Sequence, residues 1–258
     1  MTRSIILHIG APKCGSTYLQ RVMLRNQAWL RDKGVNYPHR GQGHPGNADQ
    51  IDRIGPAWID ANLGGFETLI LSHENLFSCA ARGRRLANLC YAQDISLKII
   101  AFLRPFQDWL AADYSQALRQ HLIDPETQAK PPAFATFVRR RRAKIRPTAF
   151  LENWQSLVPD HPITVAHHTD VRRVFCGLCT PLVQADWAVP KWQTNTSLPL
   201  VQSIRLEHEL ARGAAPSIEL ERRTLASVDT GAAPFAAQIN AVFKSEAQAA
   251  KTTFGVSL

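Results

Sequence analysis

Short runs of β-branched and aliphatic residues alternate along this chain with longer amphipathic segments, and this alternation is the strongest constraint on its fold. The short runs cover residues 4–9, 69–71, 97–103 and 163–166. Strands that are apolar without regular polar alternation are typical of a sheet that is buried on both faces. The pattern therefore predicts an α/β protein with three layers, in which helices flank a mostly parallel central sheet.

The length of the chain, 258 residues, is enough to bury a sizeable core. No internal repeat or low-complexity tract divides the sequence, and no segment has the composition of a linker, so we expect one domain over residues 1–258. Residues 37–65 are rich in Gly, Pro, His and Asn, which predicts a loop with a short helix. Long loops inside compact domains are often functional.

Composition favours a folded protein that does not enter a membrane. Hydrophobic residues make up 45% of the chain and charged residues 20%, which are ordinary values for globular proteins. No apolar run approaches the ~20 residues that span a bilayer. The run at residues 5–7 is shorter than the roughly 7–15 residues of a signal-peptide core. We therefore expect a cytoplasmic protein.

The cysteines do not form the pattern of a disulfide scaffold or a zinc site. Their number is odd, five, and they are scattered along the chain, whereas disulfide frameworks use even numbers in shorter chains. Cys176 and Cys179 have C-x-x-C spacing, but a structural zinc ion needs about four ligands and no second pair is present. We expect two thiols packed on one helix and no bound metal.

The chain is basic, with a formal net charge of +9 and an isoelectric point near 9.7. Such an excess favours polyanionic partners, which include nucleic acid, anionic membranes and substrates rich in phosphate, sulfate or carboxylate. The densest cluster runs from Arg139 to Arg142 and continues with Lys144 and Arg146. Two interpretations remain open for this cluster: a solvated helix face, or a surface that binds a polyanion.

The segment from His8 to Thr17 carries the strongest functional signal, because it joins the first predicted strand to a helix. Such a loop aims backbone N–H groups and the positive end of the helix at a phosphate. Gly15 permits close approach, Lys13 supplies a positive charge, and Ser16 and Thr17 offer hydroxyl groups. The lysine precedes the glycine by two positions, so this is not a Walker A motif. The alternative is an ordinary turn capped by a serine.

Residues 9–17 resemble the 5′-phosphosulfate loop of sulfotransferases that use 3′-phosphoadenosine-5′-phosphosulfate (PAPS). The usual core of that loop is Pro-Lys-Thr/Ser-Gly-Thr/Ser-Thr, and here Cys14 replaces the first Thr or Ser while keeping its backbone N–H. The resemblance, closest to bacterial members, implies a P-loop NTPase-like sulfotransferase fold, with PAPS as donor and 3′-phosphoadenosine 5′-phosphate (PAP) as product. It implies donor-binding roles for Pro12, Lys13, Cys14, Gly15, Ser16 and Thr17.

A second segment, residues 99–105 and the helix that follows, is similar to the segment that binds the 3′-phosphate in this family. The family places an arginine at the strand end and a serine on the next helix. Arg104 matches the arginine, and its planar guanidinium suits a phosphate. Ala112 occupies the serine position, but Ser115 lies three residues further along a neighbouring part of the helix face. The resemblance therefore implies Arg104, with Ser115 as a substitute.

A third segment, residues 195–198, has the sequence Asn-Thr-Ser-Leu before a predicted helix. Similar Asn-x-Ser-Leu segments occur near the nucleotide in many bacterial sulfotransferases, which implies donor contacts by Asn195 and Ser197. Two alternatives stay open: a helix cap, and a chance match to the glycosylation pattern.

Sulfuryl transfer requires a cation near the leaving oxygen, a base for the acceptor and tight positioning. The resemblance implies that Lys13 stabilises the leaving group and that no metal is needed. His73 and Glu74 follow the second predicted strand and are the candidate bases. Neighbours on a strand point to opposite faces, so we expect only one of them to face the substrate, and we prefer Glu74. Open α/β folds bind ligands at the carboxyl ends of their strands, where Lys13, Glu74 and Arg104 should gather.

The acceptor is expected to be a hydroxyl or an amine, and the net charge favours an anionic acceptor such as a carbohydrate polymer. Two other functions remain open. A different phosphate-handling enzyme, such as a nucleotide kinase, would prefer ATP with magnesium. A non-catalytic polyanion-binding protein on the same fold would show salt-sensitive binding without turnover. Residues 139–146 contain no aromatic side chain to stack on nucleic-acid bases.

Overall fold

The computed structural model describes residues 3–39, 41, 43–190, 198–225 and 233–258. The chain forms two compact units, each assembled from segments that are distant in sequence. The first unit contains Met1–Leu103, Pro147–Asn195 and Ala250–Ser257, and the second contains Arg104–Arg146, Thr196–Ala249 and Leu258. The single domain over residues 1–258 stays a prediction.

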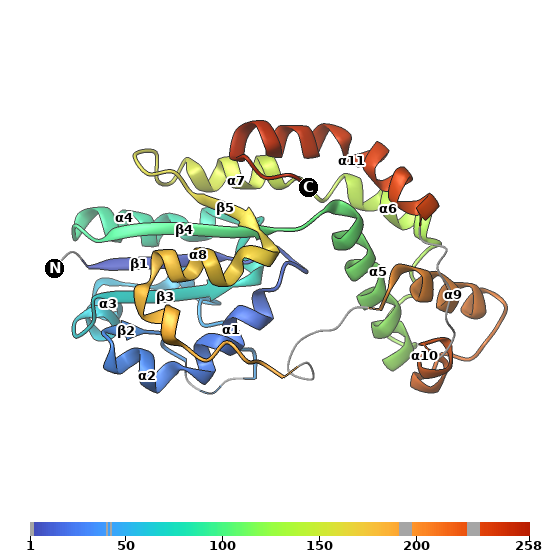
Figure 1. Ribbon diagram of the computed structural model, residues 1–258, viewed down its shortest axis with the longest axis horizontal. Helices are drawn as coiled ribbons and strands as arrows, with labels where there is room; N and C mark the ends of the chain where they lie inside the picture. Colours follow the sequence, from blue (N-terminus) through green and yellow to red (C-terminus); the bar gives the residue numbers. More distant parts are fainter. Residues whose placement is uncertain (1–2, 40, 42, 191–197, 226–232) are drawn as a thin grey trace. The chain divides into compact units, whose positions relative to one another are not determined.

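The first unit is built on a five-stranded sheet with the order β2-β3-β1-β4-β5, and every strand pair is parallel (Figure 1). The predicted α/β class, with a parallel sheet flanked by helices, is confirmed. Strand β2 was not predicted. The strands are β1 (Ser4–Ile9), β2 (Val35–Asn36), β3 (Thr68–His73), β4 (Ser96–Leu103) and β5 (Thr164–His167).

Helices cover both faces of this sheet because the central strands are apolar on both faces. Ile6, Ile70 and Ile100 point to one face, where they share a core with residues of α1 (Ser16–Arg25), α2 (Gln27–Asp32) and α8 (Val171–Leu178). Figure 1 shows α8 lying across the sheet on that side. The neighbouring residues of β1, Ile5 and Leu7, point the opposite way and are also fully buried.

The remaining helices of the first unit complete its layers. The elements α3 (Pro56–Leu63) and α4 (Arg84–Ala92) contact β3 and β4, and α7 (Pro147–Gln155) contacts the short helix η3. Short 3₁₀ helices join these elements: η1 (Ile51–Arg53), η2 (Glu74–Leu76), η3 (Ala80–Gly83), η4 (His168–Asp170) and η5 (Thr180–Gln184). The buried ring of Trp154 donates its Nε1 hydrogen to the carbonyls of Leu76 and Phe77, both at 3.1 Å. These bonds attach α7 to the segment that follows β3.

All the regular secondary structure described in the second unit is helical (Figure 1). Its helices are α5 (Phe106–Ile123), α6 (Phe134–Arg142), α9 (Leu200–Ala211), α10 (Ile218–Leu225) and the part of α11 (Ala233–Phe254) up to residue 249. Helix α5 packs against α6 and α9. Helix α5 begins one residue after Pro105, which occupies the N-cap. Within the described part of the chain, no helix has the length and apolar character needed to cross a bilayer.

Candidate functional site

The loop that follows β1 has an unusual backbone. Lys13 and Gly15 both have positive φ angles, 62° and 91°, a conformation that is uncommon for any residue other than glycine. Gly15 is the N-cap of α1, no side chain caps that helix end, and its first turn contains no acidic residue. The amino end of a helix carries partial positive charge and free N–H groups. The loop therefore presents a lysine and the end of a ten-residue helix in the manner expected for an anion site.

The hydroxyl of Ser16 is a second feature of this loop that is compatible with a bound anion. Ser16 is only 5% exposed, and its Oγ atom has no hydrogen-bond partner among the described residues. Buried polar groups are nearly always paired, so a buried hydroxyl without a partner needs an explanation. An oxygen of a bound phosphate or sulfate would supply that partner. The other loop residues differ in exposure: Pro12 is exposed, Thr17 is half-buried and Cys14 is buried.

The loop lies directly against the carboxyl end of β3. The Gly10 N–H donates to the carbonyl of His73 at 3.1 Å. A Cβ atom on Gly10 would lie 2.3 Å from Ser16 Oγ and 3.1 Å from Glu74 Cα. The structure thus brings the loop that contains Lys13 to the same edge of the sheet as His73 and Glu74. Parallel neighbours β1 and β3 end side by side, which is the physical reason for this proximity.

A buried network of hydrogen bonds joins β1, β3 and α1 next to the loop. His8 Nδ1 is hydrogen-bonded to Ser72 Oγ at 2.8 Å, and Gln20 Nε2 donates to the same oxygen at 3.0 Å. His8 is 1% exposed, and burial lowers its pKa to about 3. The imidazole is therefore neutral at physiological pH and packs against the rings of Phe102 and Phe175. We assign His8 a packing role.

The loop rich in Gly, Pro, His and Asn is held against β3 by Asn47. The Asn47 side chain accepts from the Ser72 N–H at 2.8 Å and donates to the Ile70 carbonyl at 2.9 Å, while its backbone N–H donates to the Ser72 carbonyl at 3.0 Å. These three bonds pair backbone groups of Ile70 and Ser72, near the carboxyl end of β3, with Asn47. They also place His44 and Asp49 beside His73 and Glu74.

His73 is poorly suited to serve as a base. It is 5% exposed, and burial lowers its pKa, followed in importance by the nearby His44. Its Nδ1 accepts the Asn75 N–H at 3.1 Å, and its Nε2 lies 3.8 Å from Asp49 Oδ1. A neutral imidazole has one acceptor nitrogen, and here that nitrogen is already engaged by the backbone. The proton therefore resides on Nε2, next to the carboxylate.

His44 has the same arrangement and was not identified from the sequence. Its Nδ1 accepts the Gly46 N–H at 3.0 Å, and its Nε2 lies 3.7 Å from Glu74 Oε1. The two imidazole rings lie 4.7 Å apart and 30° from parallel. The Glu74 side chain is 39% exposed, and an ionised carboxylate only accepts hydrogen bonds. Of the two candidates His73 and Glu74, Glu74 therefore offers the more exposed hydrogen-bond acceptor, and His44 lies beside it.

Two further predicted donor contacts, Arg104 and Ser115, belong to the second unit. Arg104 directly follows β4, and Ser115 lies on α5 with 1% exposure. The Ser115 Oγ accepts the Leu198 N–H at 2.8 Å, which leaves its own hydrogen free to donate. Ala112, at the position of the family serine, is buried. Asn195 and Ser197 lie outside the described residues.

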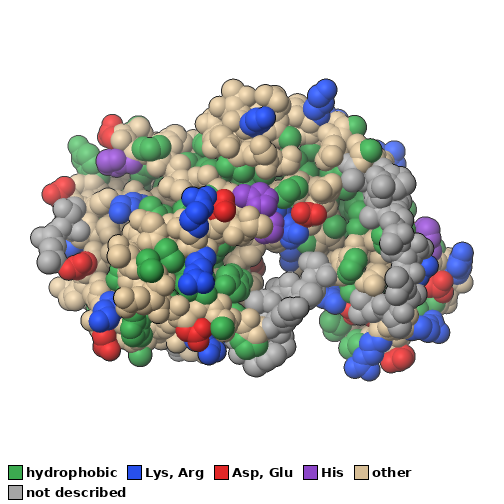
Figure 2. Space-filling model, in the orientation of Figure 1, with side chains coloured by type: hydrophobic (Ala, Val, Ile, Leu, Met, Phe, Trp, Pro, Cys, Tyr) green, Lys and Arg blue, Asp and Glu red, His purple; other side chains and the backbone are tan. Residues whose placement is uncertain are grey.

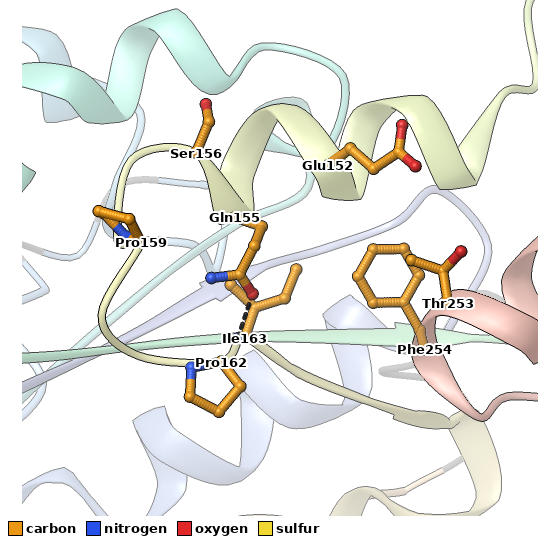
Figure 3. A pocket seen from close by; sticks show the side chains of 8 residues that line it. All are labelled: Glu152, Gln155, Ser156, Pro159, Pro162, Ile163, Thr253 and Phe254. Carbon is orange, nitrogen blue, oxygen red and sulfur yellow. Dashed lines mark hydrogen bonds between the residues drawn. The ribbon is translucent and has the colours of Figure 1, made fainter.

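A pocket of the first unit does not coincide with this site. It has a volume of about 670 Å³ and lies in the first unit between α7, the start of β5 and the end of α11 (Figure 3). Its best-placed polar group, Gln155, already accepts the Ile163 N–H at 2.9 Å through Oε1. The pocket is lined by Glu152, Gln155, Ser156, Pro159, Pro162, Ile163, Thr253 and Phe254. None of the predicted site residues is among them.

No group of three or more His, Cys, Asp or Glu side chains that could hold a metal ion occurs among the described residues. The cysteines of the C-x-x-C motif are unbridged, and burial raises the pKa of both Cys176 and Cys179. A raised thiol pKa disfavours the thiolate that metal binding requires.

No model of a known protein family matches this sequence, and no curated protein matches it either.

Proposed function

We propose that this chain is a PAPS-dependent sulfotransferase that moves a sulfuryl group to a hydroxyl or amine acceptor, such as a carbohydrate or another anionic molecule. The proposal depends most on one observation. The loop of Lys13 and the buried, unpaired hydroxyl of Ser16 lie at the start of α1, directly against Glu74 at the end of β3. An anion site beside a carboxylate acceptor fits group transfer to a protonated nucleophile.

Lys13 and the loop would bind the 5′-phosphosulfate. The ammonium of Lys13 would stabilise the negative charge that develops on the oxygen leaving the sulfur, as expected for a transfer that depends on position and electrostatics. The hydroxyl groups of Ser16 and Thr17 and the backbone N–H of Cys14 and Gly15 would donate to the phosphate oxygens. Pro12 would hold the loop in its turn. PAP would leave as the second product.

Glu74 would accept the proton of the acceptor as its oxygen or nitrogen attacks the sulfur. One S–O bond forms, or one S–N bond, and the S–O bond to the nucleotide breaks. His44, whose Nε2 lies 3.7 Å from Glu74 Oε1, would orient the carboxylate. His73 keeps its Nδ1 bond to the backbone. We therefore propose Glu74 rather than His73 as the base.

The resemblance to the family extends the donor site to Arg104 and Ser115 for the 3′-phosphate, and to Asn195 and Ser197 near the nucleotide. Arg104 carries a fixed positive charge suited to a bisphosphate. The hydroxyl of Ser115 keeps one hydrogen for donation, so its bond to Leu198 is compatible with a phosphate contact. These four assignments depend on the family pattern.

Calorimetric binding of PAP, with 5′-AMP and ATP–magnesium as comparators, tests the donor assignment. We expect a clear preference for PAP. Lys13→Ala should weaken PAP binding roughly 10–100-fold, the loss of one charge-assisted contact, whereas the exposed Lys33→Ala should not change it. Preference for ATP with magnesium would instead support a phosphate-handling enzyme such as a nucleotide kinase.

Turnover with PAPS and a panel of acceptors tests the chemistry. Glu74→Gln should bind PAP normally and lose most of its turnover, because an amide cannot take the proton. Normal turnover in Lys13→Ala or in Glu74→Gln would contradict the proposed mechanism. Salt-sensitive binding of polyanions without any transfer would favour a non-catalytic protein.

A further inference from the structure

The arginine run on α6 is divided by the phase of the helix. Phe134, Phe137 and Val138 form the buried side of α6. Arg141 follows Phe137 by four residues, so it lies on that same side. Its Nε donates to Asp113 of α5 at 2.7 Å, and its guanidinium lies over the Phe137 ring at 5.0 Å. Arg141 therefore joins α6 to α5, and it is not available to a partner.

The other cations of the run face solvent. No carboxylate within the described residues forms an ion pair with any of them, and residues 139–146 contain no Asp or Glu. Elsewhere on the face visible in Figure 2, basic and acidic side chains are interspersed. We call the exposed set the α6 basic surface; it consists of Arg139, Arg140, Arg142, Lys144 and Arg146.

Helix stabilisation explains only part of this surface. Cations in the last turn of a helix interact favourably with its dipole, which accounts for arginines up to Arg142, where α6 ends. Lys144 and Arg146 lie beyond that end and before α7 begins at Pro147. Like charges this close together repel one another. An anionic partner would remove that repulsion.

The chemistry of the surface selects the kind of partner. Guanidinium groups pair in bidentate fashion with sulfate, carboxylate and phosphate oxygens. Single-stranded nucleic acids also require aromatic side chains on which bases stack, and the aromatic residues of α6, Phe134 and Phe137, are buried at 2% and 6% exposure. A non-aromatic polymer that carries sulfate or carboxylate groups fits better.

We propose that the α6 basic surface binds an anionic polysaccharide. Arg139 and Arg142 are three residues apart on α6, which puts their Cβ atoms about 5–6 Å apart, so a short stretch of polymer contacts both at once. This binding does not require the transfer reaction, and the second unit carries it independently of the Lys13 loop.

Calorimetry with a defined heparin oligosaccharide tests the proposal, with a single-stranded oligonucleotide of equal charge as comparator. The triple variant Arg140→Gln, Arg142→Gln and Lys144→Gln should weaken heparin binding at least tenfold and flatten its salt dependence. A matched control removes three exposed cations of the first unit: Arg53→Gln, Arg84→Gln and Arg85→Gln. That control should change the affinity less than threefold.

Four results would overturn the proposal: no heparin binding by the unmodified chain, equal losses in the two triple variants, no loss in the α6 variant, or tighter binding of the oligonucleotide than of heparin. Equal losses would mean that net charge alone attracts the polymer. Melting curves of both variants establish that they fold. PAP binding measured on the same samples keeps this test separate from that of the donor site, since the α6 variant should bind PAP normally.

Discussion

Replacing Gly10 with alanine tests how tightly the loop, helix α1 and strand β3 are packed. The added Cβ would lie 2.3 Å from Ser16 Oγ, 3.0 Å from Ser16 Cβ and 3.1 Å from Glu74 Cα. The Ser16 hydroxyl can rotate away from the first contact. The other two contacts involve the Ser16 Cβ and the Glu74 backbone, so both must move by a few tenths of an ångström.

The magnitude follows from two opposing effects. Overpacking of this kind costs about 1–3 kcal/mol. Alanine also restricts the unfolded chain more than glycine does, which stabilises the folded state by about 0.4–1 kcal/mol. Gly10 does not have a positive φ, so no backbone strain is added. We expect Gly10→Ala to lower the free energy of unfolding by about 1–2 kcal/mol.

Urea unfolding followed by circular dichroism measures this change, provided that the dependence on denaturant stays the same. Gly15→Ala is an instructive comparison. A Cβ there meets no atom within 4 Å, but φ is 91°, so its expected cost of about 1–2 kcal/mol arises from backbone conformation. Adding Ser16→Ala should reduce the cost of Gly10→Ala and leave that of Gly15→Ala unchanged. A Gly10→Ala protein as stable as the unmodified chain would refute the tight packing of Gly10 against Ser16 and Glu74.

Three further predictions concern other parts of the first unit. Burial lowers the folded-state pKa of His8 from 6.5 to about 3, so the unfolded chain binds more protons than the folded chain in that interval. The free energy of unfolding should therefore fall as pH falls from 6.5 toward 3. Urea titrations between pH 7 and pH 4 should show a smaller fall in His8→Gln than in the unmodified chain. Gly83→Ala should destabilise the folded protein by about 1–3 kcal/mol, because its Cβ would lie 2.2 Å from the ring of the buried Trp154. On α8, a Cβ at Gly177 meets no atom within 4 Å. Gly177→Ala should therefore stabilise the folded protein by about 0.5–1 kcal/mol in thermal unfolding. His44→Ala should lower turnover with PAPS and leave PAP affinity unchanged, since His44 is proposed to orient Glu74. Steady-state kinetics beside calorimetry separates the two effects, and unchanged turnover would exclude a positioning role.

The sheet was predictable because most strands are apolar runs, and the exceptions have physical reasons. Strand β2, Val35–Asn36, is too short to produce a pattern, and its pairing with β3 depends on tertiary contacts. Strand β3 extends to His73, beyond the apolar residues 69–71 that identify it in the sequence. Ser72 is polar but 1% exposed, since His8, Gln20 and Asn47 satisfy its polar atoms. Hydrophobicity alone does not reveal a buried polar residue whose partners are distant in sequence.

The site was predictable to the extent that parallel strands end together. That rule places the Lys13 loop near Glu74, and the close approach of Gly10 to both Ser16 and Glu74 agrees with it. The contribution of His44 was not predictable, because it depends on the path of a loop held to β3 by Asn47. The different role of Arg141 within the arginine run follows from its four-residue spacing from Phe137, a helical relation that the sequence does contain.

The end of β3 is therefore where the fold and the candidate chemistry depend on the same hydrogen bonds. Asn47 attaches a long loop to Ser72 and so delivers His44 and Asp49 to the strand end. The backbone N–H groups two residues after each histidine then occupy both Nδ1 atoms and direct both Nε2 hydrogens toward carboxylates. This arrangement leaves the imidazoles as donors and Glu74 as the partly exposed acceptor beside the Lys13 loop. The proposed choice of Glu74 over His73 as the base rests on this backbone geometry, which strand alternation alone does not give.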